Sequence, residues 1–94
     1  MSETVKDGRA FFDSLNRVKE ARQKLYEEYP ELTALTNREL EIFGELLSNL
    51  TMKEIADAKG ISTSSVHYHY KNIYRKLNIS NRKQLLITYK NLYQ

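Results

Sequence analysis

The chain has 94 residues, which suits one small domain, because a chain of this size buries only about 60–65% of its unfolded surface. Its hydrophobic content of 40% and charged content of 29% are ordinary for a globular protein. No apolar stretch approaches the roughly 18 residues that a membrane span requires. The absence of cysteine excludes a disulfide framework, a thiolate nucleophile and a cysteine-based zinc site. The first residues show no secretory signal, so we expect a cytoplasmic protein without membrane contact.

The net charge of +3 hides a gradient along the chain. Residues 1–30 carry six basic and six acidic side chains, residues 31–60 carry three and six, and residues 61–94 carry six and none. A final third without carboxylates creates a positive potential that suits a polyanion such as nucleic acid. Basic patches also occur on proteins that never touch nucleic acid, so the charge alone does not decide the partner.

Residues 5–29 are predicted to form one long helix. Its seam positions follow one another at alternating steps of four and three residues, which is heptad spacing. They are Phe11, Leu15, Val18, Arg22, Leu25 and Tyr29. Pro30 should end the helix, because proline lacks an N–H and disfavours the α conformation in the preceding residue. We expect residues 1–30 to be a helical element that packs on the rest of the chain or on a second copy.

Two further helices are predicted after a short linker at residues 32–35. Each opens with a capping box, in which a threonine and a glutamate three residues later bond each other's backbone N–H. The pairs are Thr36 with Glu39 and Thr51 with Glu54. The first helix has an apolar face of Leu40, Phe43, Leu46, Leu47 and Leu50. The second stops at Gly60, where a left-handed conformation would make the tight corner of a helix-turn-helix motif.

Ser62 is predicted to cap a third helix over residues 63–77, and Ser80 or Asn81 a fourth. At 100° per residue, one arc of the third helix should face the core. That arc contains Val66, His69, Tyr70, Ile73 and Leu77, with Tyr74 at its edge. The fourth helix has one apolar stripe. The chain is therefore expected to be all-α, with a four-helix helix-turn-helix head at residues 31–94 and an N-terminal helical extension.

The opposite half of the third helix has no acidic residue. It carries Ser64, Ser65, His67, Tyr68, Lys71, Asn72, Arg75 and Lys76. Such side chains suit DNA, because lysine and arginine neutralise phosphates, the polar groups can bond to phosphates or base edges, and a helix fits the ~12 Å major groove. The hydroxyls of Ser62, Thr63 and Ser64, beside the N–H groups of a helix start, are an expected phosphate anchor.

Residues 35–86 also resemble a known family, the LuxR/GerE-type helix-turn-helix domain at the C-terminus of many bacterial response regulators and quorum-sensing activators. The similar segments are Leu35-Thr36-Asn37-Arg38-Glu39-Leu40-Glu41, Lys53-Glu54-Ile55-Ala56, the recognition helix Ser65-Val66-His67-x-His69-x-x-Asn72-Ile73-x-x-Lys76-Leu77, and Arg82. Two features depart from the family pattern: Ser65-Val66-His67 replaces the usual Thr-Val-Lys, and Tyr68 is larger than the usual aliphatic residue. The preferred bases therefore cannot be carried over from a relative.

The resemblance implies roles for individual residues. It implies base contacts from His67, Tyr68 and Lys71, and phosphate contacts from Thr63, Ser64, Asn72 and Lys76, to which the same helix face adds Ser65 and Arg75. It also implies that the fourth helix mediates dimerisation through the stripe Leu85, Leu86, Tyr89, Leu92 and Tyr93.

The leading hypothesis is thus a transcription regulator that binds duplex DNA as a homodimer, with residues 63–77 of each copy in the major groove. One alternative is a protein-interaction module that docks on RNA polymerase or another regulator. Another is a sigma-factor-like promoter-binding domain. An enzyme is disfavoured, because no histidine is positioned with a carboxylate and no glycine loop could bind phosphates. No cofactor or metal is expected, since His67 and His69 diverge by about 200° on a helix.

Overall fold

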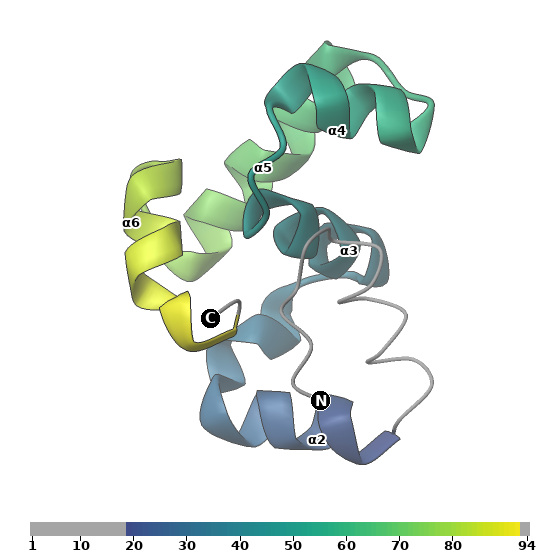
Figure 1. Cartoon of the computed structure of the whole chain (residues 1–94). Helices are drawn as coiled ribbons and strands as arrows, with labels where there is room; N and C mark the ends of the chain where they lie inside the picture. Colours follow the sequence, from purple (N-terminus) through teal and green to yellow (C-terminus); the bar gives the residue numbers. More distant parts are fainter. Residues whose placement is uncertain (1–18, 93–94) are drawn as a thin grey trace.

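The computed structural model describes residues 19–92, which are helical with no strand in that range (Figure 1). The elements are α2 (Lys19–Glu28), the 3-10 helix η1 (Pro30–Ala34), α3 (Asn37–Leu46), α4 (Met52–Lys59), α5 (Thr63–Leu77), α6 (Arg82–Thr88) and the 3-10 helix η2 (Lys90–Leu92). The expected all-α class is confirmed. The seam positions Phe11, Leu15 and Val18, and Tyr93 of the fourth-helix stripe, lie outside the described residues.

Both predicted capping boxes are formed. The Thr36 hydroxyl accepts from the Glu39 N–H at 3.1 Å, while the Glu39 carboxylate accepts from the Thr36 N–H at 2.9 Å. The corresponding distances for Thr51 and Glu54 are 3.1 and 2.8 Å. Each box satisfies N–H groups that have no partner inside the helix, so α3 and α4 start where the sequence indicates.

Left-handed residues end both helices of the motif. Gly60 has φ +67° and ψ 32°, and its N–H bonds back to the last turn of α4, which confirms the predicted corner. Ser62 caps α5 by accepting from the Ser65 N–H at 3.1 Å. Asn78, with φ +56°, ends α5. Of the two candidates for the last cap, Asn81 is the residue used, because its side chain accepts from the Gln84 N–H at 2.9 Å.

One hydrophobic core joins all the described elements. Its fully buried side chains include Leu40, Ile42, Phe43 and Leu46 of α3, Ile55 of α4, Val66 and Ile73 of α5, and Leu85 of α6. Residues 32–34 of the expected linker instead belong to η1, and Leu35 follows as its C-cap, because the fully buried Leu32 packs this segment into the core. Leu25 of α2 is also buried there, so the described part of the N-terminal helix packs on the head.

Tyr89, the residue that follows α6, anchors the C-terminal end of the head. Its ring packs on Tyr29 with centroids 5.2 Å apart and edge-on against Phe43 at 5.1 Å. Its hydroxyl donates to the Glu31 carboxylate at 2.6 Å. Burial raises the pKa of Tyr89, and the bond to Glu31 raises it further. This contact connects residues 58 positions apart and fixes the end of α6 against α2 and η1.

The predicted dimer stripe is therefore divided. Leu85 is 0% exposed and Tyr89 is 1% exposed, because both belong to the core of their own chain and cannot face a second copy in this fold. Leu86 and Leu92 are half-buried. Helical periodicity predicted correctly that one face of this segment is buried. However, η1 and α3 of the same chain contact Tyr89 on that face, so a second copy is not needed to bury it.

Polar contacts lock α3 in its place. Lys59 of α4 bridges Glu41 at 3.2 Å and Glu45 at 3.0 Å. Arg82 of α6 donates to the backbone carbonyls of Leu46 at 3.0 Å and Ser48 at 2.7 Å. These carbonyls follow the last turn of α3 and have no helical partner, so Arg82 satisfies acceptors that would otherwise be unpaired.

Candidate nucleic-acid interface

Helix α5 packs against α3 and α4 and exposes its other side to solvent (Figure 1). Val66, Ile73 and Leu77 point into the core. The exposed residues of the helix include Thr63, Ser64, His67, Tyr68, Lys71 and Arg75, while Ser65, Asn72 and Lys76 are half-buried. The predicted division of this helix into a core face and a solvent face is confirmed. We call the solvent face, formed by these nine residues, the polar face of α5.

Three aromatic or histidine residues expected on the core arc are only half-buried. They are His69, Tyr70 and Tyr74. The rings of Tyr70 and Tyr74 lie 5.1 Å apart, and those of Tyr68 and His69 lie 5.6 Å apart. These rings form the boundary between the core and the polar face. Tyr68 is 66% exposed, a high value for a large aromatic side chain.

The first turn of α5 is rich in hydroxyl groups. The Ser62 hydroxyl, besides capping the helix, donates to the Ser65 hydroxyl at 3.1 Å. Thr63 and Ser64 are exposed beside the N–H groups of the helix start. Hydroxyls and N–H groups together at the positive end of a 15-residue helix provide an arrangement that can bind a phosphate.

Several polar side chains of this face have partners within the chain. The Arg75 guanidinium donates to the Asn72 amide oxygen at 3.0 Å. Nδ1 of His67 lies 2.6 Å from the Tyr70 hydroxyl. The Lys76 ammonium donates to the Glu39 carboxylate at 2.6 Å. Glu39 thus neutralises the charge of Lys76, a residue that we predicted from the sequence to contact phosphate.

The Glu39 carboxylate is held as an anion. Burial alone would raise its pKa, but the hydrogen bond and charge of Lys76 and the N–H of Thr36 outweigh that effect and leave the pKa below its ordinary value. Glu39 and Lys76 are 37 positions apart, so no local pattern in the sequence reveals the pair.

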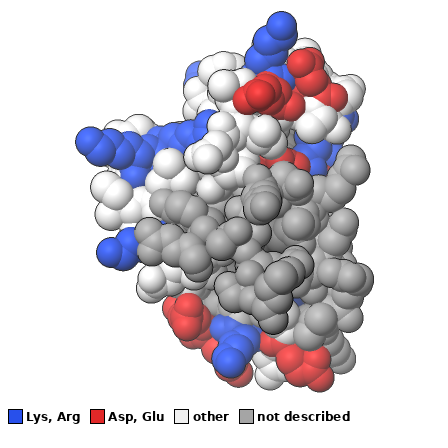
Figure 2. Space-filling view, viewed as in Figure 1, with Lys and Arg blue, Asp and Glu red and all other residues white. Residues whose placement is uncertain are grey.

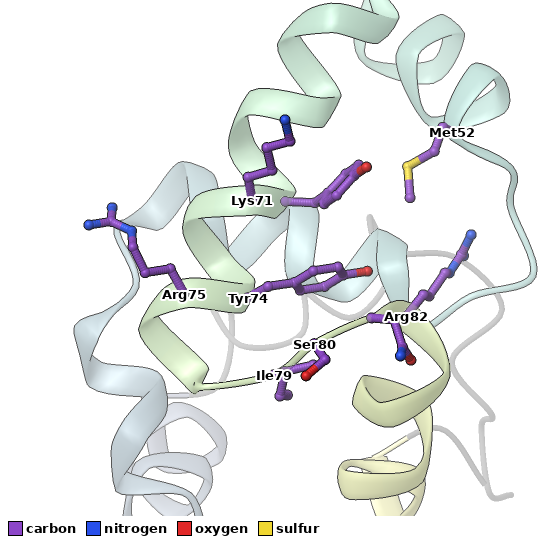
Figure 3. Close-up of a pocket in the computed structure, with 9 residues that line it drawn as sticks. Met52, Lys71, Tyr74, Arg75, Ile79, Ser80 and Arg82 are labelled. Atoms are coloured by element: carbon purple, nitrogen blue, oxygen red, sulfur yellow. The ribbon is translucent and has the colours of Figure 1, made fainter.

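An open pocket of about 520 Å³ lies between α5 and the start of α6 (Figure 3). Tyr74 points from α5 toward Arg82, whereas Arg75 extends from the other side of the helix. The remaining lining residues are Met52, Tyr70, Lys71, Ile79, Ser80 and Asn81. The Tyr74 hydroxyl is buried and has no hydrogen-bond partner among the described residues. Burial raises the pKa of this phenol, an effect that nearby Arg82 opposes.

Charged side chains are unevenly distributed on the face shown in Figure 2. Lysine and arginine side chains project from the left edge, on the side of α5 and α6. Acidic side chains gather at the bottom beside α2 and near the top beside α4, and basic side chains lie among them there. This distribution agrees with the sequences of the two helices, since α5 carries three lysine or arginine residues, α6 carries two, and neither carries an acidic residue. Among residues 19–92, no helix is long and apolar enough to cross a membrane.

Ile87 is a surface feature that the sequence interpretation missed. It is 62% exposed on α6, on the side of the helix away from the buried Leu85. The sequence could have revealed it, because Ile87 is an apolar residue two positions after the core residue Leu85. This spacing places it about 200° around the helix, on the solvent side.

Comparisons with known proteins agree with this geometry. The model of the luxR family of bacterial regulatory proteins matches residues 33–89. The chain is 38% identical over 92 residues to the Fimbriae Z protein of Escherichia coli, an alignment that covers 96% of this chain and 42% of that protein. It is 33% identical over 78 residues to the nitrate/nitrite response regulator protein NarP of Escherichia coli, covering 83% of this chain and 36% of NarP.

A third relative is the HTH-type transcriptional regulator MalT of Vibrio campbellii, which is 37% identical over 68 residues, or 69% of this chain and 8% of MalT. The chain thus spans less than half the length of these three relatives. No solved structure gives a significant match. The family match covers the whole of α3, α4, α5 and α6, which are the helices that build and present the polar face. The chain therefore belongs to the luxR family of bacterial regulatory proteins.

Proposed function

We propose that this chain binds duplex DNA in a sequence-specific manner as part of a bacterial transcription regulator, with α5 (Thr63–Leu77) in the major groove. The observation that carries the proposal is the polar face of α5, which combines exposed basic and hydrogen-bonding side chains, a hydroxyl-rich first turn and no carboxylate. The names of the relatives support it, since they include a transcriptional regulator and a response regulator. Such a protein acts on the bacterial chromosome, which places it in the cytoplasm.

The exposure of each residue on the polar face supports a division of roles. We assign base contacts to His67, Tyr68 and Lys71, which are exposed in the middle of α5. Phosphate contacts are assigned to Thr63, Ser64, Ser65, Asn72, Arg75 and Lys76. Among these Lys76 is the weakest, because Glu39 already holds its ammonium.

We further propose that residues 31–94 are the DNA-binding head and that the head acts as a homodimer on half-sites about 34–36 Å apart. The dimer contact is assigned to the outer side of α6 and the segment after it. Ile87, Leu86 and Leu92 have exposed or half-buried surface there, whereas Leu85 and Tyr89 are excluded by their burial. Residues 1–30 are assigned to a helical extension, of which Leu25 and Tyr29 pack on the head.

A mobility-shift series over salt concentration tests the DNA-binding proposal. Lys71→Ala and Arg75→Ala should weaken binding to all duplexes, and each should lower the salt slope by about 0.9, the value for one phosphate contact. Lys24→Ala is the matched control, because Lys24 is also an exposed lysine but lies on α2. His67→Ala and Tyr68→Ala should mainly change sequence preference. If Lys71→Ala and Arg75→Ala bind like the parent, the polar face is not the DNA-binding surface.

The interaction-module alternative makes a different prediction in the same assay. A chain that docks on RNA polymerase without reading DNA should bind every duplex only non-specifically, with a Kd of roughly 10⁻⁴–10⁻⁶ M at physiological salt. A parent protein that prefers one duplex over random DNA by 10³-fold or more would exclude it.

A further inference from the structure

His67 and Tyr70 form a pair on the polar face of α5. The two residues are three positions apart, so they are neighbours on the helix surface. Their ring centroids lie 4.8 Å apart, and the His67 Nδ1 atom is 2.6 Å from the Tyr70 hydroxyl oxygen. This distance is that of a good hydrogen bond. His67 is exposed, whereas Tyr70 is half-buried and packs on the ring of Tyr74.

The direction of this hydrogen bond follows from the chemistry of the two groups. A neutral imidazole has one N–H donor and one acceptor nitrogen. A phenol is a stronger donor than a neutral imidazole N–H, and an imidazole nitrogen is a stronger acceptor than a phenol oxygen. On this ground we expect Tyr70 to donate to Nδ1 of His67, which leaves the imidazole proton on Nε2.

We infer that Tyr70 is a positioning residue that fixes the tautomer of His67, so that His67 presents an Nε2–H donor to an acceptor edge of a base in the major groove. Protonation of the ring does not change this, because both nitrogens of an imidazolium are donors and the Tyr70 hydroxyl can rotate to accept. The inference deepens the proposed function and rests on it, since it takes His67 as a base-contacting residue.

The expected base is guanine. Guanine presents two neighbouring acceptors in the major groove, O6 and N7, and thymine presents one, O4, beside its methyl group. Cytosine presents the N4 amino donor, and adenine places a donor beside its N7. A histidine limited to donation is repelled by a donor and has its best partner at guanine. Without Tyr70, His67 could exchange tautomers and also accept from cytosine or adenine, so discrimination would fall.

The tautomer is measured first, without DNA. Long-range ¹H–¹⁵N NMR of the full chain, at a pH where imidazoles are neutral, should show the His67 proton on Nε2. Tyr70→Phe keeps the ring and removes the hydroxyl, and it should raise the share of the Nδ1–H form. Tyr74→Phe is the matched control, because it removes a hydroxyl from the adjoining ring that does not contact Nδ1. A parent His67 protonated on Nδ1, or a Tyr70→Phe spectrum like the parent's, overturns the inference.

Selection of bound duplexes from a random pool then measures base preference. The parent and Tyr74→Phe should enrich guanine at one position of each half-site, and His67→Ala should lose that preference. Tyr70→Phe should reduce it about three- to tenfold, the factor that one hydrogen bond of ordinary net strength supplies. A parent that enriches no sequence refutes the proposed function and the inference with it. A parent that enriches a sequence, together with a Tyr70→Phe variant that keeps the same preference at every position, refutes the inference alone.

Discussion

The Glu39→Gln substitution separates the two tasks of a single carboxylate. Glu39 closes the capping box of α3 with Thr36 and also holds Lys76 of α5 at 2.6 Å. Glutamine keeps a side-chain oxygen that can accept from the Thr36 N–H, so the cap should survive. The charge that holds Lys76 is removed. The variant therefore tests the contact between α3 and α5 without unfolding the start of α3.

The expected loss of stability is about 1–2 kcal/mol. Breaking a fully buried ion pair costs about 3–5 kcal/mol, but the Lys76 side chain is 28% exposed and can return to water when its partner loses its charge. For a domain of this size that loss lowers the Tm by roughly 4–16 °C. Lys76→Met should cost more, because it leaves the Glu39 carboxylate, 8% exposed, without a counter-charge. Thermal unfolding of the three proteins measures this order.

The pH dependence gives an independent check. Because the folded-state pKa of Glu39 lies below its ordinary value of 4.5, its ionised form stabilises the fold at neutral pH, and this stability is lost as the pH falls below about 4.5 through the lowered pKa. The stability gap between the parent and Glu39→Gln should therefore be largest near neutral pH and should narrow in acid. A gap that stays constant from pH 7 to pH 3 would show that the carboxylate charge is not the source.

The same variant should alter DNA binding in the opposite direction. With Glu39 neutral, the Lys76 ammonium becomes available to a phosphate, and the salt slope of binding should rise by about 0.9. A less stable protein that binds DNA with a steeper salt dependence is the expected outcome. Unchanged unfolding and an unchanged slope together would refute the reasoning, because the ion pair would then contribute to neither property.

Three further substitutions test other parts of the structure. Gly60→Ala should cost about 1–2 kcal/mol in denaturant unfolding, because φ is +67° there and the penalty is backbone strain, with nothing within 4 Å of an added Cβ; a cost near zero would contradict this. Tyr74→Phe should be neutral or stabilise by up to about 1 kcal/mol, since its buried hydroxyl has no partner among residues 19–92, and a clear loss would mean that the hydroxyl is bonded. Ile87→Lys should shift the mass measured by sedimentation toward monomer without lowering the Tm, because Ile87 is 62% exposed; a parent that is monomeric at high concentration would refute the dimer.

Local signals predicted the starts of the helices in the head and the ends of α4 and α5, whereas α3 ends at Leu46, before the expected Leu50, and α6 ends at Thr88, before the expected Leu92. A capping box, a left-handed glycine or a serine cap acts within four residues, so its effect is readable from sequence. Gly60 and Ser62 are both used as predicted. The end of α5 at Leu77 also agrees with the predicted range, although the sequence analysis did not single out Asn78, the left-handed residue that follows it. The residues on the polar face followed from helical periodicity alone.

The partners of those residues could not be predicted in the same way. Lys76 reaches Glu39 from 37 positions away, and Tyr89 reaches Glu31 from 58. Neither pair is visible until α5 and α6 are placed against the segments that precede them. The sequence predicts a linker at residues 32–35 for the same reason, since only the packing of Leu32 on other elements shows that the segment belongs to the core.

The apolar stripe of α6 shows that helical periodicity identifies a face that will be buried but does not identify which chain or element buries it. An apolar face can be buried by the same chain or by a second copy. The hydrophobic effect depends on the apolar area removed from water, whichever chain covers that area. In this fold Leu85 and Tyr89 are buried in the core of their own chain, where the Tyr89 ring packs on Tyr29 and Phe43. The Tyr89 hydroxyl donates to the Glu31 carboxylate. The proposed dimer contact therefore lies on the opposite side of α6, where Ile87 is exposed. Any dimer contact made there can form and separate without opening the core, so dimerisation and folding should be separable in this chain.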